Sequence, residues 1–256
     1  MLLEAEWFKL FALVLIRFSG VMATAPVLGS GSVPMMLRAA IAAATALLVT
    51  PLIAPLADPL PSDPYAYGFL AAGELVIGLC IGFVVTLVFA AVQMGGQIID
   101  MQSGFGMMNI FNPAAETQFP VFGFFLFILA VFFLLAIDGH HVILRAAAAS
   151  YEHIPPGGFQ ANGPAFGELA RRGAWIFSDG LIIAAPVAAA MFLAYGTLGL
   201  LGRVVPQIHL FIIGFPLTMA LAMLVMATFI GLYLELLDGM FSRIFRDLVW
   251  IGRVMG

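Results

Sequence analysis

Residues 73–100 read GELVIGLCIGFVVTLVFAAVQMGGQIID, and between Glu74 and Asp100 there is no charged side chain. A helix that crosses the hydrocarbon core of a bilayer needs about 20 predominantly apolar residues. The 25 residues from 75 to 99 exceed that length. This stretch therefore predicts a membrane-spanning helix with one carboxylate near each end.

The composition of the whole chain agrees with this prediction. Hydrophobic residues make up 63% of the 256 residues, charged residues make up 9%, and mean hydropathy is +1.10. Soluble domains carry about 25% charged residues, so an integral membrane protein is indicated. The ten Lys and Arg residues are scattered, which argues against a nucleic-acid partner. The single cysteine, Cys80, excludes a disulfide within the chain.

The spacing of charges predicts an all-α fold with about six hydrophobic helices in one domain, residues 1–256. Glu4 and Glu6 precede Lys9, so we expect a retained first helix and no signal peptide. With 27 Gly and 15 Pro, we expect the helices to form broken hairpins. The apolar segments are 8–29, 36–57, 69–99, 117–137, 176–202 and 204–234, with a connector at 138–174, a loop at 101–118 and a basic C-terminal tail at 235–256.

Small residues follow Glu74 at one-turn spacing. Gly78 and Gly82 lie on one helix face and allow another helix to approach closely. The partner helix is either another subunit or a helix of this chain. Glu74 is a candidate proton-relay group, because an ionisable residue at membrane depth is a functional candidate, but a helix cap or an interfacial ion pair fits its expected helix-end position.

Amides continue along the same helix. Gln93, Gln97 and Asp100 share a face at four- and three-residue spacing, and Gln102 follows. Uncharged amides in an apolar helix need hydrogen-bonding partners. We expect this face to dock against protein or to line a passage.

The loop at 101–118 is charge-free up to Glu116 and rich in soft side chains. A non-helical segment cannot face lipid, because its backbone groups would stay unpaired. Methionine and phenylalanine side chains can seal a passage and still deform around whatever moves through it. The sequence therefore predicts a gate, although an ordinary turn rich in methionine remains the alternative. The gate residues are Met101, Phe105, Met107, Met108 and Phe111.

Prolines interrupt the apolar sequence again between residues 203 and 216. Pro206 and Pro216 each remove a backbone donor, so we expect a sharp kink. Arg203 and Gln207 are candidates to bond the freed carbonyls.

No catalytic constellation is evident. His140 and His141 follow Asp138-Gly139, but adjacent histidines are expected to point in different directions, so we predict no metal site. No nucleophile elbow or phosphate loop is present, and we expect no cofactor. An intramembrane enzyme would need Glu74 and one of these histidines to meet in one cavity.

The segment Arg203–Leu217, RVVPQIHLFIIGFPL, resembles the R-x-x-P-Q-x-N-x-F-x-x-G-F-P-L-K signature of the FliR/SctT family of flagellar and type III secretion export-apparatus proteins. His209 and Thr218 replace the usual Asn and Lys. The flagellar branch is favoured by Gly214-Phe215-Pro216. The matching residues are Arg203, Pro206, Gln207, Phe211, Gly214, Phe215 and Pro216, together with Arg17, Glu74 and Gly78 elsewhere, and His209 completes the expected hinge motif as a departure from it.

The resemblance implies a non-enzymatic minor subunit of a helical hetero-oligomeric export gate in the bacterial inner membrane, within the flagellar basal body. Its implied partners are FliP-like and FliQ-like membrane subunits, an FlhB-like protein and unfolded export substrates. Residues 103–118 correspond to the family's plug. A secondary transporter for a small solute is the alternative, and it requires Glu74 to be essential for uptake.

Changing Met107 and Met108 together to Gly should let ions leak through the assembled complex, because the apolar seal is removed while the backbone can still pack. Conductance of the reconstituted complex measures this effect. Unchanged conductance in a fully assembled complex would count against the gate.

Overall fold

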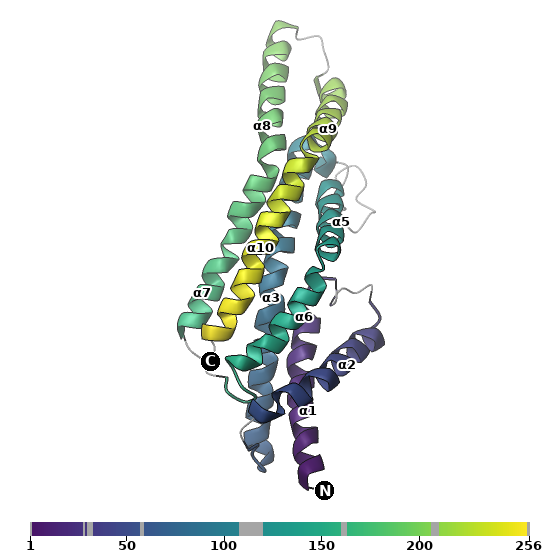
Figure 1. The fold of residues 1–256 in the computed structure, drawn as a ribbon. Helices are drawn as coiled ribbons and strands as arrows, with labels where there is room; N and C mark the ends of the chain where they lie inside the picture. Colours follow the sequence, from purple (N-terminus) through teal and green to yellow (C-terminus); the bar gives the residue numbers. More distant parts are fainter. Residues whose placement is uncertain are drawn as a thin grey trace. The chain divides into compact units, whose positions relative to one another are not determined.

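A computed structural model describes residues 2–27, 29, 33–56, 59–107, 120–159, 163–205 and 210–254. Every regular element in these ranges is helical (Figure 1). The α-helices are α1 (Leu2–Thr24), α2 (Met35–Ile53), α3 (Pro64–Ser103), α5 (Val121–Ala136), α6 (Gly139–Ala149), α7 (Gly163–Gly173), α8 (Trp175–Val204), α9 (Leu210–Thr228) and α10 (Ile230–Val254). Short 3₁₀ turns are η1 (Ala54–Leu56), η2 (Phe105–Met107) and η3 (Ser150–Glu152).

Several of these helices are long and apolar enough to cross a membrane. Four candidate spans are Glu6–Thr24, Met35–Ile53, Pro64–Ser103 and Gly167–Val204. Two bent pairs raise the number to six if each pair is one span: α5 with α6 and η3, bent by 67°, and α9 with α10, bent by 61°. The prediction of an all-α membrane protein is confirmed within the described residues.

The chain divides into two compact units. The first contains residues 1–87, 134–173 and 241–256, and the second contains residues 88–133 and 174–240. Three helices, α3, α5 and α10, continue from one unit into the other. The single domain predicted from the sequence remains a prediction.

In the first unit, α1 crosses α3 at a contact between glycines. A Cβ atom at Gly20 would lie 2.8 Å from the Leu75 carbonyl oxygen, and one at Gly78 would overlap the Arg17 carbonyl oxygen. One turn further, a Cβ at Gly82 would overlap the Thr24 hydroxyl, which bonds the Leu79 carbonyl oxygen at 3.2 Å. The small residues therefore bring two backbones of this same chain together.

In the second unit, the end of α3 holds the start of α5. The Asp100 carboxylate accepts hydrogen bonds from the Phe122 and Gly123 amides at 3.0 and 3.1 Å. These amides belong to the first turn of α5, whose N–H groups have no partner within the helix. Gly96 lets the backbones touch here, because a Cβ on it would overlap Gly123. Helices α8 and α9 pack as a hairpin in the same unit (Figure 1).

Several predicted boundaries are wrong. The connector at 138–174 contains α6, η3 and α7, because helices shorter than a bilayer leave no long gap between charges. Segment 204–234 breaks at Phe229 between α9 and α10. Pro216 lies inside α9 without ending it. Helix α3 begins at Pro64 and runs to Ser103, so Met101, which was predicted to begin the loop at 101–118, lies in the helix.

The tail at 235–256 is also not a separate segment, since α10 continues through it to Val254. In the first unit its Asp247 forms an ion pair with Arg172 of α7 at 2.9 Å. Glu168, 3.3 Å from Arg172, completes the charge cluster. One charge of the predicted tail, Asp247, therefore joins α10 to α7 within the first unit.

Changing Gly78 to Ala should lower the free energy of unfolding by about 1–3 kcal/mol, because the new methyl group overlaps the α1 backbone. Gly68, on the same helix, has nothing within 4 Å of its Cβ position, so Gly68→Ala is the matched control. That control should be neutral or stabilising, since alanine favours helix. Thermal unfolding in detergent measures both, and equal effects would refute the close crossing.

Candidate functional site

The centre of the first unit is an ion pair between Arg17 of α1 and Glu74 of α3. Both side chains are 0% exposed. Arg17 Nε lies 2.6 Å from Glu74 Oε2, and Arg17 Nη2 lies 3.0 Å from Glu74 Oε1. Two parallel bonds of this kind match the planar guanidinium to the carboxylate.

The remaining polar atoms of the pair are also bonded. Arg17 Nη1 donates to Ser150 Oγ at 2.8 Å, and Nη2 also donates to the Ile154 carbonyl oxygen at 3.2 Å. Glu74 Oε1 accepts from the Gly157 amide at 2.9 Å. The Tyr151 ring lies under the guanidinium, 3.6 Å from Arg17 Cζ, and its hydroxyl lies 3.4 Å from Glu74 Oε2. The pair thus joins α1, α3 and the η3 region.

This arrangement is suited to holding helices together. Glu74 lies eleven residues into α3, so its predicted helix-end position is wrong. Among the described residues, hydrogen bonds to Glu74 come from Arg17, Tyr151 and Gly157. A fully buried carboxylate that already accepts these bonds is not accessible to a solute or a substrate. The environment of Glu74 therefore supports neither the transporter hypothesis nor the enzyme hypothesis.

In the second unit, the last carbonyls of α3 are bonded by side chains from two other helices. Tyr195 of α8 donates to the Gln102 carbonyl oxygen at 2.6 Å, and Thr218 of α9 donates to that of Ser103 at 2.9 Å. Gly104 follows with φ of 92°, and a Cβ there would lie 2.7 Å from the Phe215 ring. The chain therefore leaves α3 at a firmly held point.

An apolar hollow of about 460 Å³ lies beside this point. Phe105 of η2 lines it and packs edge-on against Phe122, with ring centroids 5.4 Å apart. The other lining residues are Val121 and Phe125 of α5, Met223, Met226 and Ala227 of α9, and Ile230 of α10. Soft and aromatic side chains thus surround the first turn of the predicted gate loop.

The predicted gate residues differ in exposure, and only some of them lie in the part of the chain that the structure describes. Met101 is 77% exposed on the last turn of α3, and Phe105 is half-buried. Met107 ends η2, and only its backbone is described. Met108 and Phe111 lie outside the described residues.

The residues of the predicted docking face, Gln93, Gln97 and Asp100, differ in exposure. Gln93 and Gln97 are exposed on α3, whereas Asp100 is 4% exposed and turned toward α5. Gln102 is half-buried. Gln93, Gln97 and Met101 are exposed at four-residue spacing on α3. We call this surface the amide strip, after its two glutamines.

The hinge motif is only partly described. Arg203 is exposed in the last turn of α8, where a cation is favoured by the helix dipole. Pro206, Gln207 and His209 lie outside the described residues, and only the backbone of Phe211 is described. Gly214 is buried, Phe215 packs on Gly104, and Pro216 is exposed.

The histidine pair differs from the sequence expectation. His140 and His141 do not diverge, since their ring centroids are 4.0 Å apart. The ligand atoms of Asp138, His140 and His141 lie within 4.8 Å of one another. Asp138, directly before α6, has a positive φ of 55°, which residue spacing did not reveal.

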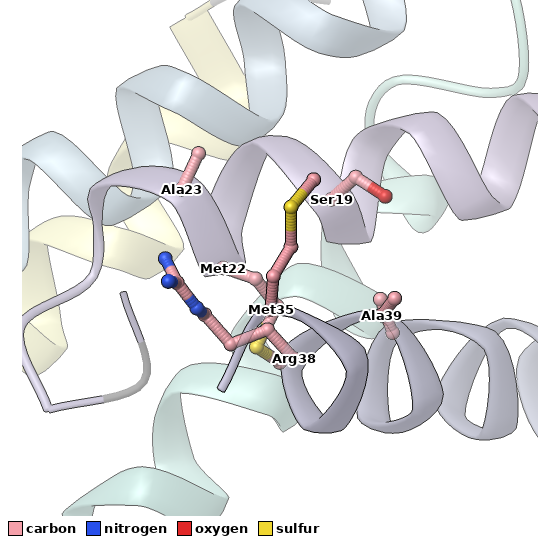
Figure 2. A pocket seen from close by; sticks show the side chains of 7 residues that line it. Ser19, Met22, Ala23, Met35, Arg38 and Ala39 are labelled. Carbon is pink, nitrogen blue, oxygen red and sulfur yellow. The ribbon is translucent and has the colours of Figure 1, made fainter. Parts of the chain in front are cut away.

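A smaller hollow of about 180 Å³ separates α1 from α2 in the first unit. Figure 2 shows Met35 and Arg38 of α2 extending toward Met22 and Ala23 of α1. Arg38 donates to the Val33 and Gly29 carbonyl oxygens at 3.1 and 3.2 Å. Arg38 thus bonds two carbonyl groups of the segment that connects α1 to α2.

Residues 8–244 match the family model described as bacterial export proteins, family 1. The chain belongs to this family. It is 32% identical over 242 residues to flagellar biosynthetic protein FliR of Escherichia coli K12, covering 94% of this chain and 91% of the relative. FliR of Bacillus subtilis is 31% identical, with 93% and 92% covered, and Yop proteins translocation protein T of Yersinia pestis is 31% identical, with 86% and 85% covered.

The ion pair between Arg17 and Glu74 was not predicted from the sequence. Nor were the contacts that Ser150 and Tyr151 make with Arg17, or the bond from Thr218 to the end of α3. The available signal was Arg17 itself, a charge inside an apolar helix that must find a partner. Thr218 occupies the position where the family resemblance led us to expect Lys, and its hydroxyl bonds the end of α3.

Arg17→Ala and Glu74→Ala should each lower the free energy of unfolding by about 3–5 kcal/mol, because one buried charge is left alone. The double variant Arg17→Ala, Glu74→Ala should lose clearly less free energy of unfolding than the sum of the two single losses. Arg171→Ala, at an exposed ion pair, is the control and should change stability by about 0.5 kcal/mol at most. Additive losses in the double variant would contradict direct coupling.

Proposed function

We propose that this chain, a membrane-embedded subunit of the flagellar protein-export apparatus, helps to form and close the channel through which unfolded flagellar proteins cross the inner membrane. The match to the export family over residues 8–244, together with the FliR relatives, carries this proposal. The role is structural, since the buried charges of Arg17, Glu74 and Asp100 are all bonded to groups of this same chain. FliP-like, FliQ-like and FlhB-like proteins are the proposed partners.

The exposed surface supports a place inside a larger assembly. Gln93 and Gln97 are exposed on a helix whose other residues are almost all apolar. An amide that faces hydrocarbon leaves donors and acceptors unpaired, which costs free energy. A neighbouring subunit can supply the missing partners, so the amide strip is the proposed docking surface.

The base of the proposed gate is rigid and its lining is soft. Asp100, Tyr195 and Thr218 fix the end of α3 to three other helices. Phe105 lies near the start of the segment proposed as the plug, residues 103–118, and lines a hollow with Phe and Met side chains. A loop held at such a base can close a passage reproducibly while its apolar residues deform around cargo.

Native mass spectrometry of the protein extracted from its host membrane tests the proposal. We expect one or a few copies of this chain with several copies of other small helical membrane proteins. A reproducible monomer or homodimer in several detergents would refute it.

The double variant Gln93→Leu, Gln97→Leu should enter this particle less efficiently, because leucine suits lipid but cannot bond a partner. Thr197→Val is the control, since the exposed Thr197 hydroxyl bonds its own helix at the Leu193 carbonyl oxygen, 2.8 Å away. Equal particle yield for the two variants would refute the amide strip as a docking surface. It would not contradict the proposed function, which the mass spectrometry tests.

A further inference from the structure

Three side chains of metal-ligating type converge at the start of α6. They are Asp138, His140 and His141, and their ligand atoms lie within 4.8 Å of one another. All three belong to the first unit, and none contributes to the proposed gate. The family match offers no role for them.

The backbone at Asp138 is in the left-handed region, with φ of 55° and ψ of 26°. Few residues other than glycine adopt this region. Asp138 occupies the position before α6 from which an aspartate normally caps a helix, yet its side chain makes no capping bond. Its carboxylate lies instead 3.5 Å from His141 Nδ1.

The imidazole of His140 completes the cluster. Its Nδ1 is out of contact with solvent and has no hydrogen-bonding partner among the described residues. The ring lies beside that of His141, with 40° between their planes.

We propose that Asp138, His140 and His141 bind one divalent transition-metal ion of the Zn²⁺ or Cu²⁺ class. Two imidazole nitrogens and one carboxylate oxygen suit these ions, whereas Mg²⁺ and Ca²⁺ prefer oxygen ligands alone. With bond lengths of about 2.1 Å, tetrahedral ligand atoms lie about 3.4 Å apart, which side-chain rotation reaches from the observed separation. Three protein ligands leave one position for water or for a group from another subunit.

The experiment uses the full chain, purified without a polyhistidine tag and titrated with Cu²⁺ and with Zn²⁺. We expect one ion per chain, with Cu²⁺ bound more tightly than Zn²⁺. Electron paramagnetic resonance of the Cu²⁺ form should show hyperfine coupling to two imidazole nitrogens. His140→Ala and His141→Ala should each weaken binding by at least about 10-fold and leave coupling to one nitrogen.

Asp138→Gly removes the carboxylate but keeps a residue that tolerates the left-handed backbone, so this variant separates ligand loss from misfolding. It should weaken binding while its thermal unfolding without metal stays unchanged. The exposed His153 of the same unit gives the control variant His153→Ala, which should bind normally. Absence of saturable binding, or equal binding by the three cluster variants and the control, would overturn the proposal.

Discussion

The bidentate bond between Arg17 and Glu74 is the constraint on which the first unit depends. Two charges removed from water must be matched atom by atom, because the desolvation cost of each is several kcal/mol. The match here includes Ser150, the Tyr151 ring and two backbone groups, drawn from segments up to 137 residues apart in the chain. These bonds depend on one another, because a buried charge without its partners is costly. Together they determine that α1, α3 and the η3 region meet. The glycines at 20 and 78 then let α1 and α3 approach closely enough for the two side chains to reach each other.

The second unit meets a different requirement at the end of α3. A helix leaves its last carbonyl groups without partners inside the helix, and side chains from elsewhere in the chain can bond them. Tyr195 and Thr218 supply the donors, and Asp100 accepts from the next helix. The region therefore combines a stiff frame with the soft side chains around Phe105.

Features that depend on local composition could be predicted from the sequence, whereas features that depend on contacts between distant residues could not. Long gaps between charges identified the spans, because lipid compatibility is a local property of composition. The same criterion missed α6 and α7, which are too short to cross and carry charges, and it made the amphipathic end of α10 look like a tail. The glycine face around Gly78 was visible at one-turn spacing, but its partner was not. The pairing of Arg17 with Glu74, 57 residues apart, has no local signature, and neither has the positive φ at Asp138.

Helix α3 contains 40 residues, which at 1.5 Å per residue gives a rod of about 60 Å, twice the thickness of a hydrocarbon core. No bilayer can cover such a rod, so the apolar surface beyond the hydrocarbon core has to be covered by protein. This chain already does much of that, since 67% of the most apolar window of α3 is buried against its own residues. The helix can therefore keep its apolar side chains away from water over a length that lipid alone could not cover.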